Sequence, residues 1–255
     1  MRRRTLPIAV AAATLACTRV ALAQATPGTA QDSSSRKFEI TDNSFLVEES
    51  FNQEPGIFQN IFTWTRSRDG EWQASFTQEW PAPGVTHQFS YTIPFSGSGR
   101  SSGVNDVSLN YRYQLLREAS GPPAISPRLS LILPTGYEAD GPGTSVLGLQ
   151  FNGPVSKQFG NLYVHANGGG TWRHHFGWTP HVAGSGIWRV TPMFNLMLEG
   201  LVEFDESATL SPGFRRGWNV GDAQLVVGAA LPVTRAESRN TVSLLTYLSY
   251  ELPFR

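Results

Sequence analysis

The segment from Asp106 to Leu115 reads DVSLNYRYQL and alternates strictly between polar and apolar side chains. Its odd-numbered positions hold valine, leucine and tyrosine, whereas its even-numbered positions hold aspartate, serine, asparagine, arginine and glutamine. Side chains of a β-strand point alternately to its two faces, so this period of two predicts a strand with one apolar and one polar face. The alternation resumes from Pro127 to Leu133, after a connection that contains Gly121 and two prolines. These two strands alone do not show whether the apolar face meets lipid or the core of a soluble protein. The rest of the chain must decide between the two.

Short alternating segments of this kind recur from Ile57 to the C-terminus, separated by Gly, Pro, Asn, Asp or Ser. The predicted strands cover residues 57–66, 71–80, 88–95, 106–115, 127–133, 144–155, 161–173, 181–190, 193–204, 209–219, 223–232 and 241–252. That is an even number of about twelve, which a single-chain bacterial barrel requires when both of its ends lie on one side. The sequence therefore predicts an all-β fold, a transmembrane antiparallel up-and-down β-barrel over residues 57–255.

Connection lengths and tryptophans provide two further arguments. Connections after even-numbered strands are mostly brief, whereas Ser96–Val104 and Thr135–Gly143, after odd-numbered strands, are longer and glycine-rich. Short periplasmic turns and longer outer loops are typical of outer-membrane barrels. Most tryptophans lie near predicted strand ends, where an amphipathic ring can sit at the membrane interface: Trp64, Trp72, Trp80, Trp172, Trp188 and Trp218. The alternative is a soluble periplasmic β-sandwich whose tryptophans fill one core.

The N-terminus carries the features of a cleaved secretory signal over residues 1–23. Three arginines precede an apolar run from Leu6 to Cys17, and Ala21-Leu22-Ala23 provides a small-residue cleavage site. Cys17 could instead be a lipoprotein acceptor, although Thr14 occupies the position where a branched apolar residue is expected. Since Cys17 is the only cysteine, the mature chain is predicted to have neither a disulfide nor a reactive thiol.

Two segments separate the signal from the predicted barrel. Residues 24–36 are rich in Pro, Gly, Thr and Ser and predict a flexible linker. Residues 37–56 mix apolar side chains with Glu48, Glu49 and Glu54 and fit a short helix about as well as a short strand. We expect this segment to lie outside the strand count, as a cap on the barrel or a plug within it.

Composition narrows the classes of partner. The chain has 20 basic and 20 acidic residues, and loss of the signal, with its four arginines, leaves 16 against 20. This balance predicts no nucleic-acid binding. After the signal, no run approaches the roughly 18 apolar residues of a membrane helix, so a membrane protein of this composition must cross with strands.

Charged and histidine side chains on the polar faces are the candidate site residues, because the polar face of a barrel strand points into the lumen. They are Arg112, Arg128, His165, Arg173, Arg189, Glu199 and Glu203. Two interpretations remain open, a polar pore or binding cavity of mixed charge, and a plugged barrel whose charges pair for stability. Arg216 shares the parity of apolar neighbours, which indicates either an interfacial arginine or a local slip of register.

Other chemistries are poorly supported. His174, His175 and His181 flank a predicted connection without an acidic or cysteine cluster, so we predict no metal site. Neither His87 nor His165 has a serine at the spacing that would place both on one face, so we predict no hydrolase and no enzyme. The glycines from Gly168 to Gly170 lie inside a predicted strand and indicate close packing or curvature, not a phosphate loop. No cofactor is expected.

Several phrases occur in the order found in one family of exported proteins. They are FTQEWP at 76–81, GVNDV at 103–107, NYRYQ at 110–114, PRLSLILPTG at 127–136, LSPGF at 210–214 and YLSYE at 247–251. Over residues 43–255 the chain resembles the family named for the MetA pathway of phenol degradation, whose members are labelled transporters. The resemblance implies a bacterial outer-membrane barrel. The chain departs from the usual aromatic terminus of such barrels, because Arg255 follows Phe254.

These patterns together predict a channel or transporter in the bacterial outer membrane. By the resemblance, its solutes would be small and aromatic or hydrophobic. The expected partners are membrane lipid, a small-molecule solute and the barrel-assembly machinery. The alternative is a closed barrel with a structural or surface-interaction role and no transport.

Overall fold

A computed structural model describes residues 39–40, 44–99, 101–138, 145–236 and 239–253. The predicted signal peptide at 1–23 with Cys17, the predicted linker at 24–36 and the terminal Phe254-Arg255 lie outside these ranges. Among the residues that the model describes, no helix is long and apolar enough to cross a membrane.

All regular structure in these ranges is β-strand, in one antiparallel sheet of seventeen segments. The segments are β1 (Ile57–Ser67), β2 (Trp72–Pro81), β3 (His87–Ser98), β4 (Ser101–Val104), β5 (Ser108–Tyr113), β6 (Ala124–Ile125), β7 (Arg128–Ile132), β8 (Tyr137–Glu138), β9 (Gly148–Asn152), β10 (Val155–Phe159), β11 (Leu162–Arg173), β12 (Gly177–Thr191), β13 (Phe194–Glu203), β14 (Ser207–Val220), β15 (Ala223–Ala230), β16 (Val233–Ala236) and β17 (Arg239–Pro253). Short breaks divide four barrel strands into β4–β5, β6–β8, β9–β10 and β15–β16, because the pieces of each share the same neighbours. The described chain thus forms the predicted barrel of twelve strands.

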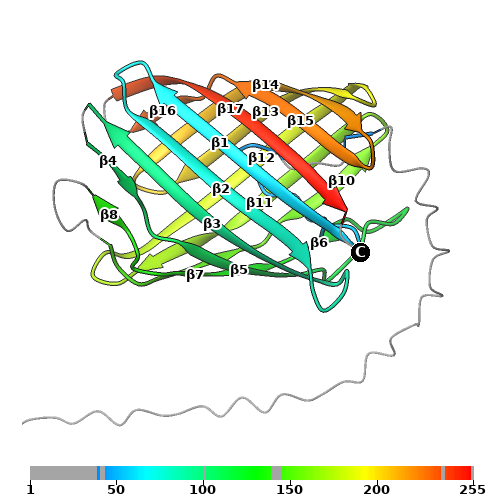
Figure 1. The fold of residues 1–255 in the computed structure, drawn as a ribbon, viewed down its shortest axis with the longest axis horizontal. Coiled ribbons are helices and arrows are strands. Elements are labelled where there is room, and N and C mark those ends of the chain that lie inside the picture. Colours follow the sequence, from blue (N-terminus) through cyan, green and yellow to red (C-terminus); the bar gives the residue numbers. More distant parts are fainter. Residues whose placement is uncertain (1–38, 41–43, 100, 139–144, 237–238, 254–255) are drawn as a thin grey trace, which may run out of the picture. The chain divides into compact units, whose positions relative to one another are not determined.

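The sheet closes on itself through its first and last strands. β1 pairs with β2 on one side and with β17 on the other, in an unbroken register from Ile57 opposite Pro253 to Ser67 opposite Ser243. The strands run steeply tilted around the wall (Figure 1), as closure of a barrel requires. We call the end where β1 begins and β17 ends the proximal end, and the opposite end the distal end.

Side chains alternate across this wall with apolar groups outside and polar groups inside. On β5, Leu109 is 47% exposed and Tyr113 is 38% exposed, whereas Asn110 and Arg112 between them are buried. The outward face carries many exposed large apolar side chains, among them Phe62, Phe89, Leu129, Phe151, Leu198, Leu210, Phe214 and Leu248. A water-soluble protein has the opposite arrangement, so this fold is not the β-sandwich considered from the sequence.

The predicted difference in connection length is wrong. β3 continues to Ser98 and β4 begins at Ser101, so most of Ser96–Val104 is paired strand and not a loop. Part of Thr135–Gly143 is likewise strand, because β8 pairs with β4. The long connection from 114 to 123 follows an even-numbered strand, at the proximal end. Polar and glycine-rich sequence suits a barrel strand beyond the apolar band as well as it suits a loop, which explains the error.

Glycines in β11 allow close packing of the wall. A Cβ atom on Gly169 would overlap the carbonyl oxygen of Phe151, and one on Gly170 would overlap the indole ring of Trp178. Gly168 beside them has open space around it. The glycine run therefore serves the packing of neighbouring strands, and not a ligand loop.

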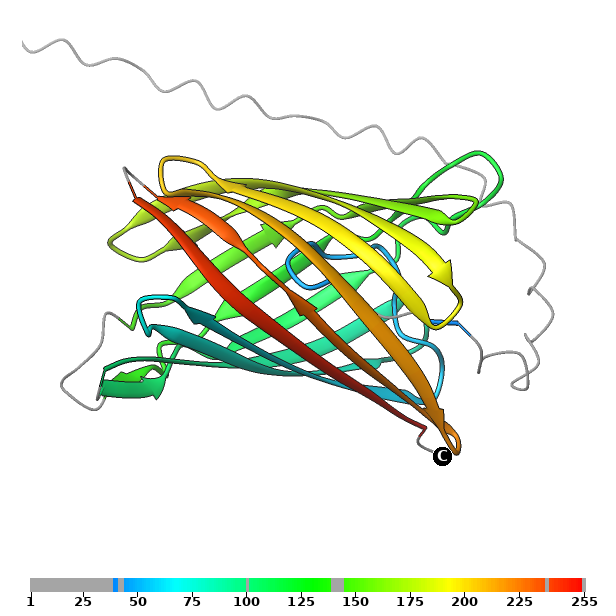
Figure 2. The same cartoon turned by 90° about the horizontal axis from the view of Figure 1, so that it is seen from above.

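Residues 44–53, shortly before β1, lie inside the barrel. Figures 1 and 2 show this stretch, in blue, folded back within the ring of strands. Residues 44–53, which we call the plug, have no helix or strand of their own. Ile40 precedes them and packs with Ile61, Val226 and Leu245 in a small apolar cluster on the inner wall.

Candidate functional site

The plug fills the proximal and middle parts of the barrel interior, where its backbone has no ladder of its own. Buried N–H and C=O groups need partners, and here side chains of the wall provide them. Glu199 on β13 accepts three backbone N–H bonds with one oxygen, from Phe45 at 3.0 Å, Leu46 at 2.9 Å and Val47 at 3.2 Å. This carboxylate fixes the turn at the innermost point of the plug.

Amide side chains hold the next part of the plug. Asn167 on β11 accepts from the N–H of Glu48 and donates to its carbonyl, both at 2.7 Å. Gln114 also bonds to the plug backbone in both directions, but to two different residues. It donates to the carbonyl of Ser50 at 2.8 Å and accepts from the N–H of Asn52 at 3.1 Å. Gln88 accepts from the N–H of Gln53 at 2.6 Å. These contacts recognise the path of the backbone, not the identity of its side chains.

The Glu48 carboxylate, by contrast, is recognised as a side chain. Its Oε1 lies 3.2 Å from Arg112 Nη1, and its Oε2 lies 2.9 Å from Arg128 Nε. Asn152 Nδ2 donates to the same Oε2 at 2.7 Å. One carboxylate therefore bridges three strands of the wall, β5, β7 and β9.

Arg112 makes the most contacts with the plug of the seven predicted residues. Its Nη1 also donates to the carbonyl of Glu49 at 3.0 Å, its Nη2 to the carbonyl of Phe51 at 2.8 Å, and its Nε to Asn52 Oδ1 at 3.1 Å. Only 4% of its side chain is exposed, and the wall's own Glu79 lies 4.0 Å away. All three nitrogens of the guanidinium therefore donate hydrogen bonds, which suits the planar arrangement of donors in arginine.

Glu49 contacts another part of the wall. Its Oε1 lies 3.7 Å from Arg215 Nη1 on β14 and 3.8 Å from His165 Nε2 on β11. His165 Nδ1 is 2.7 Å from Ser156 Oγ, which in turn accepts from the N–H of Ser50 at 2.8 Å. Sequence spacing missed this serine because it lies on β10, opposite His165 in the register. Since Ser156 is fully buried under the plug, the pair serves to hold the plug.

Apolar side chains of the N-terminal segment fit places where the wall has glycine. A Cβ atom on Gly228 would overlap the ring of Phe45, which also packs 4.8 Å from the Tyr247 ring, measured between centroids. A Cβ atom on Gly217 would come within 2.9 Å of Ile40. The inner wall therefore complements this segment in shape as well as in charge.

The remaining predicted residues lie away from the plug's centre. Arg173 pairs with Asp106 at 3.3 Å, and Glu203 accepts from Ser207 Oγ at 3.1 Å, both toward the distal end. Arg189 pairs with Glu39 at the proximal end, with its guanidinium 5.6 Å from the centre of the Tyr163 ring. The structure brings Arg112, Arg128, His165 and Glu199 together through the plug and leaves Arg173, Arg189 and Glu203 in separate contacts.

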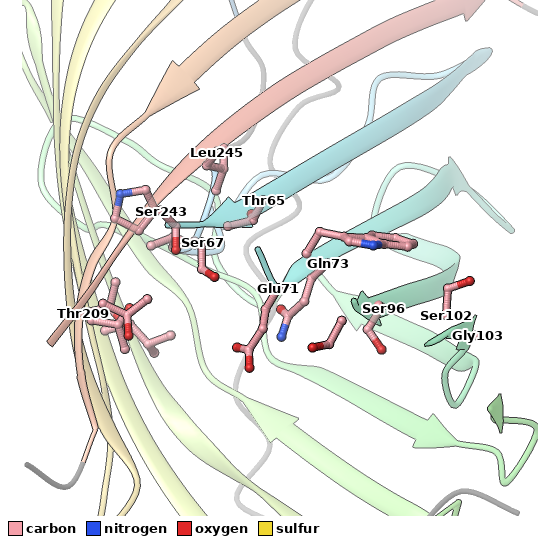
Figure 3. Close-up of a pocket in the computed structure, with 18 of the residues that line it drawn as sticks. Thr65, Ser67, Glu71, Gln73, Ser96, Ser102, Gly103, Thr209, Ser243 and Leu245 are labelled. Carbon is pink, nitrogen blue, oxygen red and sulfur yellow. The ribbon is translucent and has the colours of Figure 1, made fainter. Parts of the chain in front are cut away.

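The distal half of the interior is open. It contains a cavity of about 660 Å³, which we call the vestibule (Figure 3). Its lining includes the hydroxyl side chains of Thr65, Ser67, Ser96, Ser98, Ser101, Ser102, Thr209, Thr234, Thr241 and Ser243. Leu46, at the inner turn of the plug, lines it together with Leu201 and Leu245, and Glu71 is its one acidic member among the residues described.

The structure also shows where Arg216 and the three histidines considered as metal ligands lie. Arg216 points outward, with its guanidinium 5.4 Å from the centre of the Trp218 ring, so the register does not slip there. His174 and His175 lie together in the connection between β11 and β12, whereas His181 Nε2 is 3.2 Å from Asn152 Oδ1. In the described ranges, no three His, Cys, Asp or Glu side chains are arranged to hold a metal ion.

Comparison with solved structures finds the same fold in outer-membrane channels. An outer membrane channel from Pseudomonas putida F1 matches over 80% of this chain and 98% of its own, with a TM-score of 0.59 and 15% identity. The KdgM porin matches over 77% of this chain and 99% of its own, with a TM-score of 0.54 and 10% identity. A structure of the KdgM porin with disordered oligogalacturonate has a TM-score of 0.51, at 11% identity and the same coverage. At these identities the likeness shows the fold alone.

No protein-family model and no curated sequence matches the chain. The resemblance to the phenol-degradation family therefore stays a prediction.

Proposed function

We propose that this protein is a channel of the bacterial outer membrane that admits small molecules, and that the plug restricts its pore. The observation that carries the proposal is the inverted wall, with exposed leucine and phenylalanine side chains outside and buried polar ones inside. A closed sheet satisfies every backbone group within the wall, so this is an arrangement that lipid tolerates. The fold shared with known channels supports the proposal.

The vestibule and the plug divide the path of a solute into two parts. A solute entering at the distal end meets a hydroxyl-lined cavity of about 660 Å³, which is large enough for a small molecule. At its floor it meets Leu46 of the plug. Passage to the proximal end requires the plug to shift, because residues 44–53 fill the space between the wall strands.

The chemical nature of the solute is a separate question. Aromatic or hydrophobic solutes are what the family resemblance implies. The vestibule offers mainly hydroxyl groups, together with the Gln73 amide, the Glu71 carboxylate and a few apolar side chains that include Trp72 and Leu201. This lining favours solutes that form hydrogen bonds.

Liposome swelling and single-channel recording test the channel directly. We expect the full-length protein to conduct weakly and a variant lacking residues 38–56 to conduct strongly, because the deletion removes the plug and leaves all seventeen wall segments intact. A full-length protein that does not conduct at all, with a leak that appears only when these residues are removed, would instead be the closed structural barrel. The dense hydrogen bonding of the plug is the observation that favours that second function.

Location has its own test. A lipid-embedded closed barrel should sediment with outer membranes, resist carbonate extraction and migrate anomalously fast on gels when unheated, because it has no free edge from which to unzip. Recovery in the soluble periplasmic fraction would refute the membrane assignment.

A further inference from the structure

The wall recognises the plug in two chemically different ways. Most contacts are to the backbone, through Glu199, Asn167, Gln114 and Gln88, and would hold many sequences. Cationic side chains of the wall, in contrast, meet two adjacent carboxylates, those of Glu48 and Glu49. This is a site for two negative charges inside the barrel.

The two carboxylates are bound by different parts of the wall. Glu48 lies between Arg112 on β5 and Arg128 on β7. Glu49 faces Arg215 on β14 and His165 on β11, and the exposed fractions of Arg215, His165 and Glu49 are 4%, 1% and 6%. His165 Nε2 is buried without a hydrogen-bond partner, and Arg128 Nε, although 2.9 Å from Glu48 Oε2, is not aligned to donate to it. The Arg128 guanidinium therefore has capacity for an anion that fits the site better than the plug does.

The basic side chains belong to the wall strands β5, β7 and β14, so they would remain in the barrel if the plug moved. Arg112 would retain Glu79 at 4.0 Å. Arg128, however, has no acidic group within ion-pair distance except Glu48 among the residues that the model describes, and its other contacts are to Asn110 and Gln150. Arg128 is 24% exposed, and a partly buried cation left without its partner is disfavoured, so the wall favours replacement of the plug carboxylates by another carboxylate.

We propose that Glu48 and Glu49 stand in for a small dicarboxylate anion, which binds Arg112, Arg128 and Arg215 in their place and displaces the plug. Leu46, two residues before Glu48, lines the vestibule, so an anion in that cavity is next to the plug. This inference rests on the proposed channel function, because the anion that displaces the plug would also be the solute that passes through the channel. It assigns to the barrel a class of solute, small carboxylates, that the family resemblance does not imply.

Thiol labelling on the full chain tests the displacement without requiring conductance. Ser185 on β12 is 6% exposed and its Oγ lies 3.4 Å from Ser44 Oγ of the plug, so a cysteine from Ser185→Cys should react with uncharged N-ethylmaleimide only when the plug shifts. We expect succinate to speed the reaction several-fold and the uncharged succinamide, of the same shape, to leave it unchanged. No effect of succinate, or an equal effect of both, would overturn the inference.

Charge-neutralised variants extend the test. In the Ser185→Cys protein, adding Glu48→Gln and Glu49→Gln should make labelling fast from the start, and succinate should then slow it by occupying the arginines. Glu71→Gln is the matched control, since it removes a lumen carboxylate in the vestibule, and it should label like the parent. Labelling of the double variant that is fast but indifferent to succinate would also count against the site.

The channel and the anion site can fail separately. If succinate speeds labelling but liposomes stay impermeable, the anion site stands and the channel function falls. If liposomes swell in neutral solutes while succinate leaves labelling unchanged, the channel stands and this inference falls. Unheated gel mobility of each variant verifies that its barrel has folded.

Discussion

The proximal and distal halves of the barrel have the same wall and opposite interiors. In the proximal half, buried arginines and amides are saturated by the plug, as Arg112 and Asn167 show. In the distal half, hydroxyl side chains border an open cavity, and two of them, Thr209 and Thr234, bond to each other across strands at 2.9 Å. Strong, buried charge pairs fix a segment in place, whereas hydroxyl groups facing solvent can exchange partners with water at little cost. The difference predicts where substitutions will matter.

The largest effect is expected at Arg112. Arg112→Ala removes four contacts to the plug and one of the two arginines that bind the partly buried Glu48, and breaking the ion pair of a buried arginine costs about 3 to 5 kcal/mol. The loss should appear in the free energy of unfolding, measured by denaturant titration in detergent. Arg173→Ala is the matched control. Its side chain is 43% exposed with one ion pair, so about 0 to 1 kcal/mol is expected. Equal losses would show that the two halves do not differ.

The comparison assumes that both halves share one lipid-facing wall, and Leu109 tests this. Leu109→Arg places a charge on the exposed outer face of β5 and should cost about 2 to 4 kcal/mol if that residue lies near the bilayer midplane. Folding yield into vesicles and denaturant titration measure it. Tyr137→Arg, also outward but on β8 at the distal end, should cost no more than about 1 kcal/mol. If Leu109→Arg folds as well as Tyr137→Arg, the outer face is not in lipid.

A smaller effect should follow from filling the space under the plug. Gly228→Ala introduces a Cβ atom that overlaps Phe45, and overpacking of this kind costs about 1 to 3 kcal/mol. The plug should shift, so that a cysteine from Leu46→Cys labels faster with N-ethylmaleimide. Gly168→Ala has no atom within 4 Å of the new methyl group and serves as the control. Unchanged labelling in the Gly228 variant would mean that the wall is not shaped around Phe45.

The smallest effect is expected in the vestibule. Thr209→Val removes a hydroxyl bond to Thr234, but Thr209 lines an open cavity where water can satisfy the remaining hydroxyl. Stability should change by no more than about 0.5 kcal/mol, as measured by thermal unfolding. A loss as large as that of Gly228→Ala would show that the vestibule is as tightly organised as the plugged half.

Local pattern was sufficient for most of the fold. The period of two in Asp106–Leu115 and its repeats gave the strand type, the number of strands and the face of each side chain, because alternation in an extended chain depends only on adjacent residues. It failed for Ser96–Val104, where strands continue beyond the apolar band and the sequence loses its apolar positions. Polar composition alone cannot separate a loop from a solvated strand.

The contacts that hold the plug join residues that are far apart in the sequence. Glu48 meets Asn167 across 119 positions and Asn152 across 104, and Ser156 meets His165 only through the pairing of β10 with β11. Arg215, Gln114 and Asn167 belong to the same inward faces as the predicted residues, yet no short motif marks them. The sequence by itself determined which side chains would face inward, because strand geometry is local. Only the tertiary structure decided which of them meet, because closure of the barrel and the return of the plug into it bring distant strands around one segment.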